Sequence, residues 1–108
     1  MIYELRIYDC LPARLPALLK RFNDHTLALW DKHGIRQAGF FTTLVGENSN
    51  RLTYFLAWES LAEREQKWGA FITDPAWLEA RDHSERDGPI LANVSSQFLT
   101  PTAFSSVK

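Results

Sequence analysis

Several features that would point to a particular class of protein are scarce or missing in this sequence. The single cysteine, Cys10, cannot form an intrachain disulfide, and such sparse cysteine usage is typical of a reducing compartment. The 12 basic and 13 acidic residues nearly cancel, so no charge excess favours a nucleic acid or an acidic membrane as partner. No apolar run reaches the roughly 20 residues of a membrane-spanning helix, and no basic-apolar signal peptide precedes the first strand. We therefore expect a cytoplasmic protein with no nucleic-acid and no membrane partner.

Recognisable catalytic motifs are missing as well. The sequence contains no glycine-rich phosphate loop and no Gly-x-Ser-x-Gly elbow of a serine hydrolase. Its three histidines are dispersed without the spacing of metal ligands, so we predict no metal site and no cofactor. Cys10 is interpreted as a small buried residue near a strand end and not as a catalytic thiol.

The chain does contain the elements of one globular domain spanning residues 1–108. Of these residues 45% are hydrophobic, an ordinary share for a packed domain. An unbroken apolar and aromatic run from Leu52 to Trp58 predicts a central strand covered on both faces. Ser60 and Glu63 directly after it form a capping box, which predicts the start of an amphipathic helix.

The remaining elements follow from periodicity and from turn residues. Strands are predicted over residues 2–9, 36–45 and 89–99, and a long helix ends at Gly34 with an apolar stripe that includes Leu19 and Leu29. Asp74 and Pro75 begin a short helix, and residues 81–88 are predicted to be an exposed loop. The order βαββαβ predicts an α+β, ferredoxin-like fold with an antiparallel sheet, in which the first and third strands are central.

The first strand alternates between two different faces. Tyr3, Leu5 and Ile7 share one face, and the other carries Glu4, Arg6 and Tyr8. Both helices must cover one face of the sheet, and we expect Glu4, Arg6 and Tyr8 on the uncovered face. A second copy of the chain is the natural cover, so the sequence predicts a homodimer with these three residues at its interface. We interpret Glu4 and Arg6 as an ion pair at this interface, in preference to the alternative that they contact a ligand.

A family resemblance covers nearly the whole chain, through motifs whose order and spacing are informative together. They are Tyr3-Glu4-Leu5-Arg6-x-Tyr8, Lys32-His33-Gly34, Gly39-Phe40-Phe41-Thr42, Trp58-Glu59-Ser60-Leu61 and Asp74-Pro75-x-Trp77. With them the chain resembles the NIPSNAP family. The resemblance implies a dimeric α/β barrel, in which two ferredoxin-like sheets stack face to face. The same superfamily includes cofactor-free monooxygenases, muconolactone isomerases and haem-degrading enzymes, whereas NIPSNAP members have no settled activity.

Candidate site residues follow from the aromatic content of the sheet. Tyr54, Trp58 and Tyr8 are predicted to line a pocket for a planar compound, with His33 at its mouth. His33 could act as a general acid–base, although its place in a last helical turn is already favoured by the helix dipole. Trp68 and Trp77, at apolar helix positions, are interpreted as core residues.

Two classes of function fit these observations. The first is a small oxygenase or isomerase that acts on a planar, mostly apolar compound in a dry pocket. Haem degradation is one branch of this class and would require a histidine that opens into the pocket to bind iron. The second class is a binding or scaffold dimer without chemistry.

Overall fold

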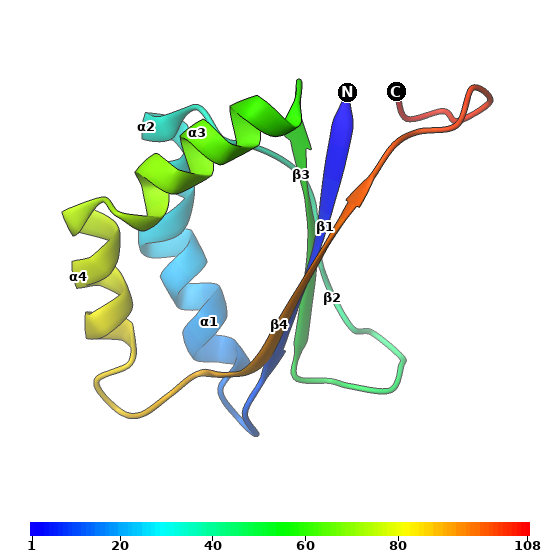
Figure 1. The fold of residues 1–108 in the computed structure, drawn as a ribbon. Helices are drawn as coiled ribbons and strands as arrows, with labels where there is room; N and C mark the ends of the chain where they lie inside the picture. Colours follow the sequence, from blue (N-terminus) through cyan, green and yellow to red (C-terminus); the bar gives the residue numbers. More distant parts are fainter.

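Helices cover one face of a four-stranded antiparallel sheet, and the opposite face is left without them (Figure 1). The computed structural model describes residues 1–108. The strands are β1 (Ile2–Cys10), β2 (Arg36–Thr42), β3 (Arg51–Trp58) and β4 (Leu91–Leu99), and the helices are α1 (Leu15–Arg21), η1 (Phe22–Thr26), α2 (Leu27–His33), α3 (Leu61–Ile72) and α4 (Pro75–Ser84). The sheet order β2-β3-β1-β4 confirms the α+β ferredoxin-like prediction with β1 and β3 at its centre.

The alternation of β3 decides which side chains enter the core. Leu52, Tyr54, Leu56 and Trp58 are buried towards the helices, and the residues between them are partly exposed on the other face. Within one chain this strand is therefore covered on one face only, which differs from the expectation of cover on both. The helix-facing side of β1 carries Glu4, Arg6 and Tyr8, all of them buried.

The first helix contains a π-helical turn. The backbone N–H of Leu27 donates to the carbonyl of Phe22, five residues back, so the turn is wider than an α-helical one. This wider turn brings Trp30 onto the buried face, whereas Leu29 is only partly buried and Leu19 is exposed. The predicted stripe, which assumed α-helical spacing throughout, is wrong at Leu19 and does not include Trp30. Single π-helical turns occur frequently at functional sites.

The predicted helix caps are confirmed by their hydrogen bonds. The Glu63 N–H donates to Ser60 Oγ over 3.1 Å, and the Ala76 N–H donates to Asp74 Oδ1 over 2.9 Å. Gly34 ends α2 with a left-handed φ of 72°, a conformation that glycine adopts without strain. Helix α4 continues to Ser84, so the loop predicted from residue 81 is shorter. Arg81 lies in that last turn, where its positive charge complements the negative end of the helix dipole.

Strand β2 is shorter than predicted and is interrupted by a bulge. The register with β3 shifts between Gln37 and Phe40, where Gly39 has a φ of 113°. The strand ends at Thr42, and Leu44 and Val45 beyond it are almost fully exposed. These two residues continue the apolar pattern in sequence but have no partner strand, so the pattern overestimated the strand length.

The uncovered face of the sheet is apolar. Tyr3 and Phe55 lie on it, together with Phe41, and with Leu99 and Pro101 they line a groove of about 440 Å³. The C-terminal residues reach this groove, where the Tyr3 hydroxyl donates to the Lys108 carbonyl over 2.9 Å. None of the helices is long and apolar enough to cross a membrane.

Candidate functional site

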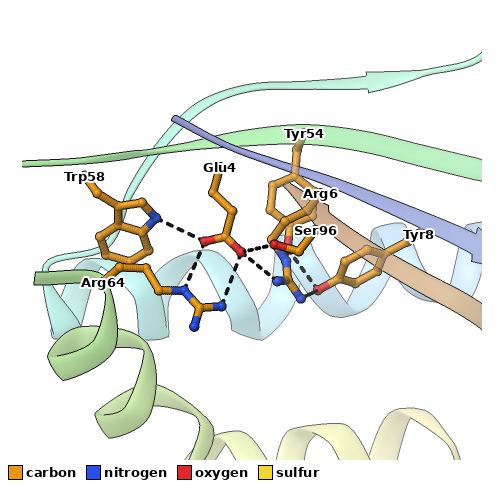
Figure 2. Close-up of polar contacts among 7 residues, drawn as sticks. All are labelled: Glu4, Arg6, Tyr8, Tyr54, Trp58, Arg64 and Ser96. Carbon is orange, nitrogen blue, oxygen red and sulfur yellow. Dashed lines mark hydrogen bonds and ion pairs between the residues drawn. The ribbon is translucent and has the colours of Figure 1, made fainter. Parts of the chain in front are cut away.

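Glu4 lies at the centre of a buried polar network between the sheet and α3 (Figure 2). Its Oε1 accepts hydrogen bonds from Trp58 Nε1 over 3.1 Å and from Arg64 Nε over 3.2 Å. Its Oε2 accepts from Arg6 Nη1 over 2.9 Å and from Ser96 Oγ over 2.7 Å. Burial would raise the pKa of Glu4, but these donors, Arg64 first among them, lower it below its ordinary value. The carboxylate is therefore held in its charged form inside the protein.

Arg6 connects this carboxylate to two tyrosines. Its Nε donates to the Tyr54 hydroxyl over 2.8 Å and its Nη2 donates to the Tyr8 hydroxyl over 3.1 Å. The Trp68 ring covers the guanidinium, with 4.5 Å from Cζ to the ring centroid. Burial alone would lower the pKa of Arg6, but the oxygens of the tyrosines and of Glu4 raise it above its ordinary value. Arg6 is thus a permanent buried cation with a counter-ion and a stacked aromatic ring.

The Tyr8 hydroxyl proton has no acceptor within this network. The Tyr54 hydroxyl donates to the Tyr8 oxygen over 2.9 Å, and Arg6 donates to both oxygens. Burial raises the pKa of Tyr54 well above its ordinary value, so Tyr54 is a neutral donor to its neighbour. Tyr8 accepts two hydrogen bonds in this arrangement and its own O–H is free to donate elsewhere.

A cavity of about 250 Å³ adjoins Tyr8 and Arg6, between the helices and the sheet. Its aromatic lining consists of Tyr8, Phe22, Trp30, Trp68, Phe71 and Trp77. Its charged lining consists of Arg6, Arg21, Arg81 and Glu85. A cavity of about 150 Å³ is enough for benzene, so this one has room for a compound with one or two aromatic rings. Apolar walls with a few convergent polar groups are the usual form of a small-molecule site.

Two nitrogen atoms on residues that line the cavity are buried without a hydrogen-bond partner in the protein. They are Nε of Arg21 and Nε1 of Trp30, on side chains that flank the π-helical turn. Arg21 is 4% exposed, and burial lowers its pKa from the ordinary value. Buried polar groups in folded proteins are almost always paired, so this pair of orphaned donors is a distinctive property of the cavity.

The structure brings one of the four predicted pocket residues to the cavity. Tyr8 lines it, whereas Tyr54 and Trp58 are fully buried behind the lining and packed on other side chains. Trp58 instead orients Glu4 through its indole N–H. Trp68 and Trp77 were interpreted as core residues, but both are only partly buried and line the cavity.

His33 lies away from the cavity. Its Nε2 is 2.7 Å from Asp74 Oδ2, and Lys32 Nζ is 2.9 Å from the same oxygen. Asp74 caps α4, and hydrogen bonds from Lys32 and His33 hold its pKa well below the usual range. His33 therefore ties the end of α2 to the start of α4, a structural role.

The prediction that Glu4, Arg6 and Tyr8 lie on the uncovered face is wrong. All three are buried beneath the helices of the same chain, so they are not available to a second copy. The sequence showed only that they share a face. Their charges are tolerated in the interior because each is paired and hydrogen-bonded.

Several important residues were missed from the sequence, and periodicity could have found them. Arg64 stands four residues before Trp68 and seven before Phe71, on the same helix face. Arg21 stands three residues after the buried Leu18, so its position also indicated an inward charge.

The geometry does not fit haem or a protein-bound metal ion. The predicted haem ligation requires a histidine in the pocket. The cavity lining contains none. No group of three or more His, Cys, Asp or Glu side chains converges so as to hold a metal ion.

Comparison with known proteins identifies the family. The NIPSNAP family model matches residues 3–106. The chain belongs to the NIPSNAP family. None of the curated proteins matches it, but solved structures of other NIPSNAP proteins do.

Two such relatives share the fold over nearly their full length. A NIPSNAP family protein from Agrobacterium tumefaciens is 26% identical with a TM-score of 0.87, covering 100% of this chain and 94% of that one. A NIPSNAP domain protein from Burkholderia xenovorans is 25% identical with a TM-score of 0.83, covering 97% and 98%. The wider fold includes a candidate antibiotic biosynthesis monooxygenase from Nitrosomonas europaea, with 11% identity, a TM-score of 0.64 and coverage of 94% and 98%. That match shows a shared fold alone.

Proposed function

We propose that this NIPSNAP protein binds a small planar, mostly apolar compound in the cavity between its helices and its sheet. One observation carries the proposal: aromatic side chains line that cavity, and two of its lining residues have a buried hydrogen-bond donor without a partner. The Glu4 network supports it, since a fully paired ion cluster holds Arg6 and Tyr8 rigidly at the cavity wall.

The part of the cavity wall that carries Arg6 and Tyr8 favours an isomerase-like reaction over an oxygenase-like one. The Tyr8 hydroxyl can donate its proton to a carbonyl oxygen of the bound compound, and the adjacent Arg6 cation stabilises the negative charge that develops. Enolisation of a ketone needs such a donor together with a base that removes the proton from the neighbouring carbon, and Glu85 is the carboxylate in the cavity lining that can accept it. The test uses 2-tetralone in D2O. Deuterium exchange at the carbon next to the carbonyl that is faster with the protein than without it would support this reaction. Binding of 2-tetralone without such exchange would support a non-catalytic binding module.

Binding itself can be measured with the neutral, planar probe 2-naphthamide. Three of the four tryptophans line the cavity, so we expect saturable quenching of tryptophan fluorescence. Trp68→Ala removes an aromatic wall and should weaken binding by about tenfold. Phe98→Ala is the matched control, because Phe98 is an aromatic residue that contacts Arg64 but does not line the cavity. Wild-type protein that shows no saturable quenching would remove the binding proposal and leave the scaffold function.

A second copy of the chain is proposed to cover the open face of the sheet. That face exposes apolar side chains, with Phe41 55% exposed beside Phe55, and such patches are association surfaces. The match to dimeric α/β-barrel structures supports stacking of two sheets face to face.

A cytoplasmic location stays a prediction.

We expect sedimentation of the wild type at twice the 12.4 kDa chain mass at micromolar concentration. Phe55→Glu should shift the protein to the monomer without unfolding it, because Phe55 lies opposite Leu5 on the half-exposed face. Lys20→Glu, on the exposed side of α1, changes a surface charge and should leave the mass unchanged. A monomeric wild type, or a dimeric Phe55→Glu variant, would contradict this assembly.

A further inference from the structure

The two buried arginines of this chain differ in how their charge is balanced. Arg6 is 2.9 Å from the Glu4 carboxylate and uses all three of its guanidinium nitrogens in hydrogen bonds. Arg21 makes one hydrogen bond, from Nη1 to Ser84 Oγ over 3.3 Å, and its nearest carboxylate oxygen is Glu85 Oε1 at 4.0 Å. The guanidinium of Arg21 is therefore a buried charge whose one ion pair, with the partly exposed Glu85, is long.

The surroundings do not supply the missing negative charge. Three arginines line the cavity against a single glutamate. The Glu4 carboxylate behind the wall is already shared between Arg6 and Arg64. A weakly paired buried charge is unfavourable, and an anion placed in the cavity would compensate it.

The geometry of Arg21 suits a planar anion. Its guanidinium lies 5.2 Å from the centroid of the Trp77 ring, a contact that restricts the orientation of the side chain. Its Nε has no partner in the protein, and a guanidinium edge that includes Nε can bind a carboxylate through two parallel hydrogen bonds. Trp30, on the next part of the same helix, also lines the cavity, and its indole N–H is buried without a partner in the protein.

We propose that the compound bound in this cavity is a carboxylate, and that the Arg21 guanidinium is the group that binds it. The aromatic walls hold the planar apolar body, and the Tyr8 hydroxyl is a further donor at the lining. This inference rests on the proposed function, because it names the chemical class of the compound that the cavity holds.

The decisive comparison is between 2-naphthoate and its neutral isostere 2-naphthamide, with the wild-type protein at neutral pH. We expect at least tenfold tighter binding of the carboxylate, measured by tryptophan quenching and by calorimetry. If the two probes bind equally well, the cavity binds planar compounds but has no preference for an anion, so this inference fails and the proposed function stands. If neither probe binds, the proposed function fails with it.

Arg21→Met removes the charge and keeps most of the apolar stem. It should fold normally and be at least as stable as the wild type, since replacing an uncompensated buried charge with a hydrophobic residue is neutral or favourable. Its preference for 2-naphthoate over 2-naphthamide should disappear, while 2-naphthamide binding persists. Arg86→Met removes the same charge from an exposed position outside the cavity and should keep the preference.

Small anions offer a last check. Sodium chloride and sodium acetate, each titrated against bound 2-naphthoate at constant ionic strength, should displace it only weakly, because neither carries the planar apolar body. Displacement of 2-naphthoate by chloride at low millimolar concentration would overturn the proposal in favour of a simple halide site. Retention of the carboxylate preference in Arg21→Met would also overturn it, by assigning the anion to another residue.

Discussion

Glu4→Gln should lower the free energy of unfolding by about 3–5 kcal/mol, the usual cost of removing one partner from a buried ion pair. The substitution preserves the shape of the side chain but leaves Arg6 and Arg64 without their shared counter-ion. Domains of this kind are stable by only about 5–15 kcal/mol, so the effect is a large share of the total. Urea unfolding followed by far-UV circular dichroism measures it.

The pH dependence of this loss provides an internal control. The pKa of Glu4 is lowered from 4.5 in the folded protein, so its charged form contributes stability above the unfolded-state pKa. That contribution is lost as the pH falls through the folded-state pKa. The difference between the wild type and Glu4→Gln should therefore be largest at neutral pH and should shrink in acid. Glu65→Gln, at an exposed position of α3, should change stability by less than about 0.5 kcal/mol. A loss for Glu4→Gln below about 1 kcal/mol would refute the role of Glu4 as the shared counter-ion.

Phe71→Ala should cost about 3–5 kcal/mol, the range for truncating a large buried aromatic side chain. Phe71 is 2% exposed and joins α3 to the other helices through ring contacts. Its centroid lies 4.9 Å from that of Trp77, 5.2 Å from Trp68 and 6.2 Å from Trp30. Thermal and urea unfolding of the variant measure the loss.

Trp68→Ala is the informative partner of this substitution. Its ring is only partly buried and borders the cavity, so we expect a loss on the order of 1.5 kcal/mol. A tryptophan in the core, as the sequence suggested, would cost as much as Phe71. Equal losses for the two variants would contradict the partial burial of Trp68.

Local patterns in the sequence were sufficient for the elements and their order. The Ser60 capping box, the Asp74–Pro75 helix start and the Gly34 cap are each made by residues that lie within four positions of one another. Such signals act through neighbouring backbone groups, so they can be recognised without tertiary information. The sheet order followed from the same elements, because short connections and right-handed crossovers leave few topologies.

The candidate site depended on distant contacts. Alternation along β1 showed that Glu4, Arg6 and Tyr8 share a face, but not that the helices cover this face. That choice rests on Trp58, Arg64 and Ser96, which bond to Glu4 across 54, 60 and 92 positions of sequence. A charged strand face is buried only when such partners converge on it, and one strand's pattern contains no information about them.

The composition of this chain, its family motifs and its local signals determined by themselves an α+β fold of NIPSNAP type. Tertiary structure alone decided that the cavity lies beneath the helices, that Tyr8 and Trp68 border it, and that Tyr54 and Trp58 do not. It also decided the position of Trp30, since a single π-helical turn between α1 and α2 changes the spacing of the buried face. The physical reason is common to these cases: packing and charge compensation join residues far apart in the chain, whereas periodicity reports only the neighbours of each residue.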